Sequence, residues 1–258
     1  MMNKFSEVDE KGNFKSKFAS PSSRFFGTTE KLLSGRICIA SMAVGAARAC
    51  LYIAITYAKQ RMAVGQTGES DTPIFDYQLQ QNALMPLLAR TVALSLLHVK
   101  CKDIYQKPKG FENELLSLCC IDKTLNGWNL ERVASICRER CGGQGYLSHN
   151  KFADYISIAH AGLTAEGDNR VLMVKICKDM ITNITKKGHK LPQMQNCPFR
   201  HIAKLGDISS LETLLDLLKF RETFLFGKLT SDIKNLTPKV GAYNVLMQET
   251  SDVMQNLA

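Results

Sequence analysis

The sequence is poor in aromatic residues and in proline, and each shortage excludes a class of protein. Only 8% of the 258 residues are aromatic, and the basic residues are not interleaved with Phe or Tyr, so we expect no nucleic-acid partner. With Pro 7, Gly 17 and 45% hydrophobic residues, the chain is neither collagen-like nor disordered. The formal net charge of +9 suits an anionic membrane or a phosphate-bearing small molecule, and its sign alone does not choose between them.

Paired cysteine motifs are also missing. The nine cysteines are an odd number and lie mostly inside apolar runs, which predicts free thiols in a reducing compartment. Cys137 and Cys141 are four residues apart on one helix face, but no second pair matches them. We therefore expect no metal site.

The two ends of the sequence show none of the common targeting patterns. The polar first residues are followed by Glu7, Asp9 and Glu10, which fits neither a secretory signal nor an Arg-rich transit peptide. The last four residues, from Gln255 to Ala258, are not of the Ser-Lys-Leu type that directs proteins to peroxisomes.

Apolar periodicity predicts an all-α fold without convincing strands. The run 37–58 is long enough for a membrane span, but Arg48 falls in its middle and small residues supply much of it. We therefore expect it to be the central helix of a soluble bundle, with no membrane span. Apolar residues at steps of three and four predict further helices over residues 75–105, 113–141, 168–185, 209–227 and from about 241 onward.

Several residues mark expected helix boundaries. Pro86 should kink the second helix, and Gly127 should interrupt the third. Ser209 with Glu212 forms a capping box that should start the fifth helix, which should end at Gly227. Residues 180–206 hold no acidic side chain and are broken by glycine and proline, which is typical of a linker.

Two short segments are candidates for chemistry. Residues 137–146 read CRERCGGQGY, which is either a helix stop or a glycine turn whose backbone N–H groups contact a pyrophosphate. Glu166, between Ala165 and Gly167, either complements the dipole of the following helix or serves as a general base in an apolar cleft that raises its pKa. No histidine is paired with a nucleophilic Ser or Cys in a recognisable motif, so the sequence predicts no hydrolase triad.

Separated motifs in this chain resemble those of peroxisomal acyl-CoA oxidases. They are the run 137–146, the run 159–169 (AHAGLTAEGDN), residues 75–81 with 85–89, residues 33–36 and residues 215–222. The resemblance implies the C-terminal four-helix bundle of that family plus a truncated second helical domain. It implies an irregular segment over 1–30 that resembles the tail of a missing β domain, a flavin-contacting helical domain over 31–190, and a linker with the truncated domain over 191–258.

The resemblance also implies roles for single residues. Glu166 corresponds to the general base that removes the α-proton of an acyl-CoA while FAD accepts the β-hydride. Six residues correspond to contacts with the FAD of the other subunit of a dimer: Arg61, Gln78, Gly142, Gly143, Gln144 and Gly145. Residues 61–65 read RMAVG where the family often has RRQFG, so the Gln and Phe that contact the cofactor are replaced.

Two hypotheses about function follow from the resemblance. The first is an FAD-dependent acyl-CoA oxidase of fatty-acid β-oxidation that produces trans-2-enoyl-CoA and hydrogen peroxide in the peroxisome. The alternative is a catalytically inactive helical module that forms a dimer with a full-length acyl-CoA oxidase. Bound flavin in the purified chain distinguishes them.

Overall fold

The structure is a computed structural model that describes residues 6–21, 23–24, 27, 32–110, 114–187, 210–241 and 244–257. The chain divides into two compact units, Met1–Gly167 and Asp168–Ala258. The domain boundaries expected at residues 30/31 and 190/191 lie outside the described residues.

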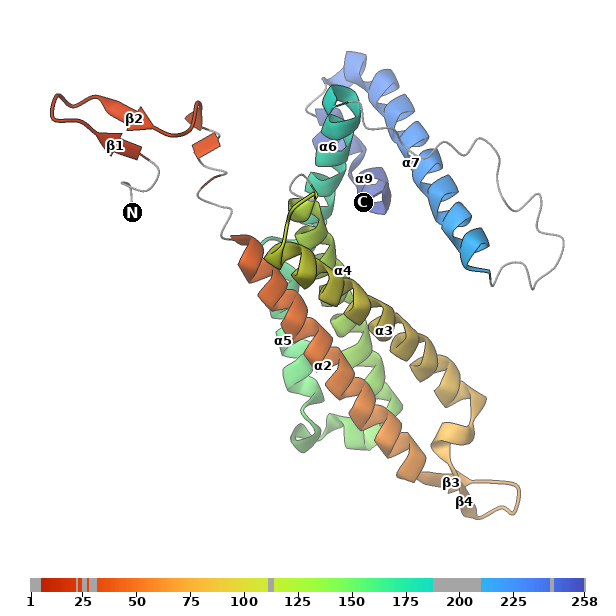
Figure 1. The fold of residues 1–258 in the computed structure, drawn as a ribbon. Coiled ribbons are helices and arrows are strands. Elements are labelled where there is room, and N and C mark those ends of the chain that lie inside the picture. Colours follow the sequence, from red (N-terminus) through yellow and green to blue (C-terminus); the bar gives the residue numbers. More distant parts are fainter. Residues whose placement is uncertain are drawn as a thin grey trace. The chain divides into compact units, whose positions relative to one another are not determined.

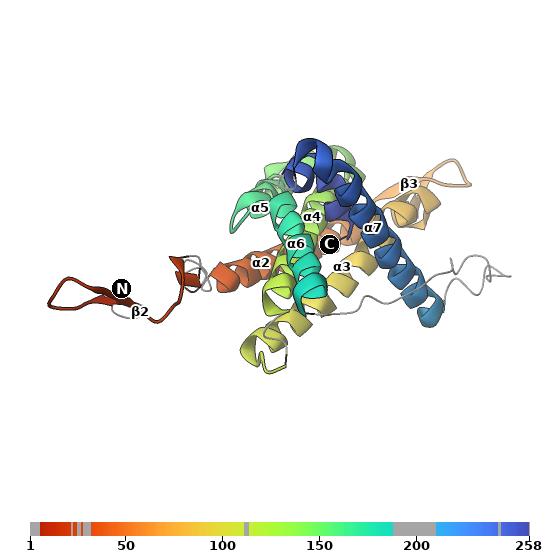
Figure 2. The ribbon, with the colours of Figure 1, turned by 90° about the horizontal axis from the view of Figure 1, so that it is seen from above.

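Four helices make up most of the first unit and lie side by side in both views (Figures 1 and 2). They are α2 (Leu32–Gln60), α3 (Gln78–Gln106), α4 (Leu115–Arg140) and α5 (Phe152–Thr164). The all-α expectation is confirmed, although α5 was not predicted as a helix. A 3₁₀ turn over Gly142–Tyr146 follows α4 directly.

Small residues bring α2 close to its neighbours. Ala43, Ala47, Cys50, Ala54 and Ala58 on one face of α2 are buried in the bundle core, which they share with residues of α3, α4 and α5. Side chains of this size let helix backbones approach closely, and the core then packs at the density of an organic solid. Although α2 and α3 are long and apolar enough to cross a membrane, α2 provides the central core of the bundle, as the sequence predicted.

Two short antiparallel hairpins belong to the first unit, where the sequence showed no convincing strand. They consist of β1 (Ser6–Val8) with β2 (Phe14–Ser16), and β3 (Met62–Val64) with β4 (Ser70–Pro73). Strands of three or four residues are too short to show alternation, so the expectation of no strands is wrong at these two places. Within residues 1–30, expected to be irregular, β1 and β2 pair with Ser6 opposite Ser16.

The second unit consists of α6 (Asn169–Lys187), α7 (Leu211–Val240), a π-helical turn (Val245–Glu249) and α9 (Ser251–Leu257). Asp168 caps α6, because its Oδ1 accepts the backbone N–H of Arg170 at 2.9 Å. Cys177, Leu229 and Met254, one each from α6, α7 and α9, form a fully buried core. Val245, in the π-helical turn, is fully buried as well.

Two expected helix boundaries, at Gly127 and at Gly227, are wrong. Gly127 is buried inside an uninterrupted α4, and Gly227 lies in the middle of α7, which continues to Val240 because Leu229 and Ile233 extend its apolar face. Ser210 caps α7 by accepting the Thr213 N–H at 3.1 Å. The capping box expected at Ser209 lies outside the described residues, and of the linker expected over 180–206 only 180–187 are described, as the end of α6.

Candidate functional site

Glu166 lies in the turn that follows α5, in an unusual backbone conformation. Its φ of 59° is in the left-handed region, which residues with a side chain rarely adopt. Such conformations cost about 1–3 kcal/mol and are found where the surrounding structure fixes them, often at functional sites.

Two cationic side chains fix this turn from opposite sides. Lys123 of α4 is fully buried, and its Nζ donates to the carbonyls of Leu163 at 3.2 Å and of Gly167 at 2.6 Å. Arg36 of α2 donates from Nε to the carbonyl of Glu166 at 3.2 Å. The carbonyls at the end of a helix have no partners within the helix, so these cations satisfy groups that the end of α5 leaves open.

The carboxyl group of Glu166 rests on the first turn of α2. A Cβ atom added at Gly35 would lie 2.4 Å from Oε1 of Glu166, so only glycine leaves room for the carboxyl in this place. Glu166 is half-buried there. The apolar cleft around Glu166 stays a prediction.

Sequence reasoning missed three residues at this site. Gly35 and Arg36 lie within the run 33–36 that supported the family resemblance, but the pattern gave neither of them a role. Lys123 had no signal, because a lysine on a helix is normally exposed and only the packing of α4 against α5 shows that it is buried.

The other predicted residues gather at the opposite end of the bundle, the lower end in Figure 1. Arg61 follows α2 directly, and its carbonyl accepts the N–H of Ile74 at 2.8 Å. Gln78 is the first residue of α3. Two residues further on, Gln80 donates from Nε2 to the carbonyl of Arg140 at 3.1 Å, which joins the start of α3 to the end of α4.

The glycine turn after α4 has an open face and a closed face. Gly142 has a φ of 59°, and no atom lies within 4 Å of a Cβ position built on Gly142 or Gly143. Gly145 is buried, and a Cβ there would meet the carbonyl oxygen of Arg138 at 2.0 Å. The carbonyl of Gln144 accepts from Nδ2 of Asn150 at 2.5 Å, and Gln144 itself is exposed.

The residues at this end suit a flat anionic ligand such as a dinucleotide. Arg61 and Gln78 are exposed, and the exposed backbone of Gly142 and Gly143 carries no side chain that would block a ligand. Within the described residues, Nε of Arg140, two positions before Gly142, is buried without a hydrogen-bond partner. This N–H group is therefore an unsatisfied donor close to the glycine turn. The residues present therefore fit the cofactor that the resemblance implies.

The cysteines next to this turn behave as core residues. Burial raises the pKa of the Cys141 thiol to about 11 and raises that of Cys137 as well. Both thiols therefore stay protonated at neutral pH. Among the residues that the structure describes, no group of three or more His, Cys, Asp or Glu side chains could hold a metal ion.

Glu166 and the glycine turn are far apart. Gly35 lies in the first turn of α2 and Arg61 directly follows its last residue, and 29 residues at about 1.5 Å each extend roughly 43 Å. A single bound ligand molecule of dinucleotide size therefore does not contact both ends of the same bundle.

The helical fold of this chain is also found in solved acyl-CoA oxidases. Acyl-CoA oxidase-1 of Caenorhabditis elegans, solved in complex with FAD and ATP, matches 98% of this chain with a TM-score of 0.79 at 16% identity. Arabidopsis thaliana acyl-CoA oxidase 1 matches 98% of the chain with a TM-score of 0.75 at 20% identity. At these identities the likeness shows the fold alone, and the chain covers 39% and 41% of the two structures.

The sequence comparisons decide the family. Residues 30–181 match the family described as "Acyl-CoA oxidase, C-alpha1 domain", so this chain belongs to the acyl-CoA oxidase family. The peroxisomal acyl-coenzyme A oxidase 3 of Arabidopsis thaliana is 33% identical over 257 residues, 99% of this chain and 37% of the relative. The acyl-coenzyme A oxidase-like protein of Mus musculus is 26% identical over 252 residues, 90% of this chain and 40% of the relative. The chain thus spans about two fifths of the length of these relatives.

Proposed function

We propose that this chain supplies the helical, base-bearing part of an FAD-dependent acyl-CoA oxidase of fatty-acid β-oxidation. The observation that carries the proposal is the fixed turn at Glu166, whose carboxyl is seated on Gly35 while Arg36 and Lys123 hold the backbone around it. A group that moves a proton in every turnover must be held at one position, and this arrangement does that.

In the proposed reaction, Glu166 takes the proton from the α-carbon of an acyl-CoA onto one oxygen of its carboxyl group. The contact with Gly35 limits where that oxygen lies, and Arg36 and Lys123 keep the strained backbone of Glu166 in place. FAD, when bound, would supply the acceptor for the β-hydride and a route for the electrons to dioxygen, so the products would be trans-2-enoyl-CoA and hydrogen peroxide.

Arg61, Gln78 and the glycine turn, with Gly142, Gly143, Gln144 and Gly145, are proposed to contact a flavin held by another subunit. The length of α2 supports this division, because the two ends of one bundle are separated by roughly 43 Å at about 1.5 Å per residue. We therefore propose that the active form is a homodimer, or a pair with a longer relative. We also propose a peroxisomal location, since the Arabidopsis relative carries that word in its name.

The alternative function is a helical module without activity of its own that pairs with a full-length oxidase. The observation that favours it is the sequence of residues 61–65, RMAVG where the family often has RRQFG, which replaces two expected cofactor contacts. An absorbance scan of the purified chain with added FAD separates the two, since a protein-bound flavin band supports the oxidase and its absence supports the module.

For the flavin-loaded protein, Glu166→Gln tests the base. The amide keeps the shape of the carboxyl but takes no proton, so peroxide production on acyl-CoA should fall by about 10²–10⁴-fold while the flavin spectrum stays the same. Glu10→Gln, at an exposed carboxyl between β1 and β2, is the matched control and should change neither quantity. Unchanged peroxide production in the Glu166→Gln variant would rule out this role for Glu166.

A further inference from the structure

Three side chains from three helices form a hydrogen-bonded chain that the function proposed above does not use. Oγ of Ser41 on α2 lies 2.8 Å from Nε2 of His98 on α3, and Nδ1 of His98 lies 2.8 Å from Oδ2 of Asp122 on α4. The sequence predicted no hydrolase triad, and it gave no sign that these three side chains meet. The residues are 57 and 24 positions apart, so no local motif contains them.

The partners of Asp122 indicate which atom donates and which accepts in each of these hydrogen bonds. Nδ2 of Asn126 donates to Oδ1 of Asp122 at 2.9 Å, and when Asp122 is ionised its Oδ2 can only accept as well. His98 then donates through Nδ1–H, and its Nε2 is left to accept the hydroxyl proton of Ser41. Burial raises the pKa of Asp122, and the hydrogen bonds from His98 and Asn126 oppose that shift.

The three hydrogen-bonded side chains differ sharply in how far they are exposed to solvent. His98 is 4% exposed and Asp122 is fully buried, whereas Ser41 is exposed. The exposed Ser41 hydroxyl is therefore hydrogen-bonded to a buried base, His98, which the buried carboxylate of Asp122 orients. A nucleophile within hydrogen-bonding distance of a base that a third group orients is the arrangement that activates serine toward acyl groups.

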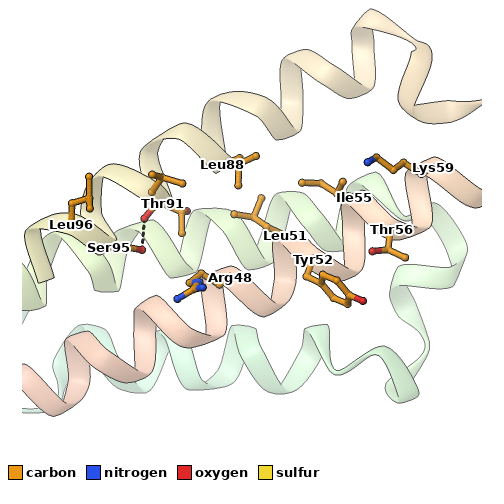
Figure 3. A pocket seen from close by; sticks show the side chains of 11 residues that line it. Arg48, Leu51, Tyr52, Ile55, Thr56, Lys59, Leu88, Thr91, Ser95 and Leu96 are labelled. Atoms are coloured by element: carbon orange, nitrogen blue, oxygen red, sulfur yellow. Dashed lines mark hydrogen bonds between the residues drawn. The ribbon is translucent and has the colours of Figure 1, made fainter. Parts of the chain in front are cut away.

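An apolar groove lies between α2 and α3, the two helices that carry Ser41 and His98 (Figure 3). It has a volume of about 630 Å³, within the range of small-molecule sites. Leu51, Ile55 and Leu88 line it, with Arg48 near one end and Lys59 near the other in Figure 3.

The end of the groove at Arg48 is the one that leads to Ser41. Ser95, which lines the groove, is three residues before His98 on α3, and Arg48 is seven residues after Ser41 on α2. Gly45 lies between Ser41 and Arg48, and no atom is within 4 Å of a Cβ position built on it. An elongated molecule in the groove can therefore approach the Ser41 hydroxyl along the surface of α2.

The position of Ser41 in the middle of α2 limits the reaction. The backbone N–H groups there are bonded within the helix, so no free pair of them can stabilise the oxyanion of a tetrahedral intermediate. Fast turnover, as in a serine hydrolase, needs such donors. A single acyl transfer that leaves a long-lived acyl-serine does not require repeated turnover.

We propose that Ser41 is an acylation site that accepts the acyl group of a long-chain acyl ester or thioester. The Oγ of Ser41 forms a bond to the carbonyl carbon while its proton passes to Nε2 of His98. The bond from that carbon to the leaving oxygen or sulfur breaks, and the leaving group takes the proton from His98. No electrons are exchanged with an oxidant or reductant. The groove holds the alkyl chain of the donor, and Arg48 and Lys59 favour donors with an anionic group.

The test incubates the intact chain, without flavin, with p-nitrophenyl decanoate and locates the decanoyl group by peptide mass spectrometry. We expect about one decanoyl group per chain, on Ser41, with a matching burst of p-nitrophenolate. Ser95 provides the comparison within the same protein, because its Oγ donates only to the carbonyl of Thr91 at 2.6 Å and has no histidine partner. Equal labelling of Ser41 and Ser95 would overturn the proposal without any variant.

Variants sharpen this test. His98→Gln removes the base and should lower labelling of Ser41 by about 10²-fold or more, while Ser95→Ala should leave it unchanged. Asp122→Asn is the second variant and should also lower the labelling rate, since it no longer fixes the tautomer of His98. Full labelling of Ser41 in a folded His98→Gln protein would contradict the proposal.

The length of the donor's alkyl chain tests whether the groove binds it. p-Nitrophenyl decanoate should label Ser41 faster than p-nitrophenyl acetate does, because only the longer alkyl chain fills the apolar groove. Leu88→Glu, which places a charge in the groove, should lower the rate of labelling by the decanoate ester. Equal rates for the two esters would overturn the choice of a long-chain donor. Because the assay needs no flavin and does not involve Glu166, its outcome is independent of the oxidase function proposed above.

Discussion

The two ends of the helical bundle differ in how they treat backbone polar groups. At the Glu166 end, buried Lys123 and half-buried Arg36 take up the carbonyls of a strained turn. At the other end, the turn at Gly142 and Gly143 leaves its backbone open. A group that transfers a proton needs a fixed position, whereas a surface that contacts a cofactor needs accessible backbone, and the same bundle provides one of each.

Removing the buried cation should give the largest loss of stability. Lys123→Met leaves the carbonyls of Leu163 and Gly167 without their donor, which should cost roughly 1–3 kcal/mol for each group that stays unsatisfied. Urea unfolding measures the loss. Lys151→Met, at the other end of α5, removes only an exposed 3.4 Å pair with Asp154 and should change stability by less than about 0.5 kcal/mol. Similar losses in the two variants would show that Lys123 does not hold the turn.

Alanine substitutions at two positions of the glycine turn should have different effects on stability. Gly145→Ala places a Cβ 2.0 Å from a backbone oxygen, which a side-chain rotation cannot relieve, so stability should fall by about 1–3 kcal/mol. Gly143→Ala meets no atom within 4 Å and should leave stability nearly unchanged. Thermal unfolding of both variants makes the comparison, and an equal shift in Tm would contradict the open and closed faces described here.

Gly143→Ala also tests the proposed contact with the cofactor. If flavin lies against this backbone, the added methyl group should weaken flavin binding several-fold, as measured by titration of the absorbance band. Unchanged flavin affinity in a normally stable variant would place the cofactor elsewhere.

The smallest change in stability is expected at Gly35. Gly35→Ala pushes against the end of the flexible Glu166 side chain rather than against backbone, and alanine favours a helix by up to about 1 kcal/mol, so the Tm should hold or rise. Oxidase activity of the flavin-loaded protein should still fall, because the carboxyl is displaced. Gly227→Ala in α7, where nothing lies within 4 Å, is the matched control and should leave activity as it was. Full activity in Gly35→Ala would show that this position of the carboxyl is not needed.

The sequence predicted the helices of the bundle well, because each of them carries its own apolar period. It predicted α2 and α3 to within a few residues, but it missed α5 and ended α7 too early at Gly227. A single glycine costs a helix about 1 kcal/mol, which the buried contacts of Leu229 outweigh. The short hairpins were missed because pairs of three or four residues leave no pattern to detect.

By itself, the sequence determined the fold class, the family and the residues in the family motifs, among them Glu166 and Gly142. Periodicity and motifs are local, so they can be read without knowing which helices meet. Only the tertiary structure decided that Lys123 is buried beneath the Glu166 turn and that Ser41 meets His98 and Asp122. Those contacts join residues 24 to 57 positions apart in the sequence, so no local pattern contains them and only the packing of the helices brings them together.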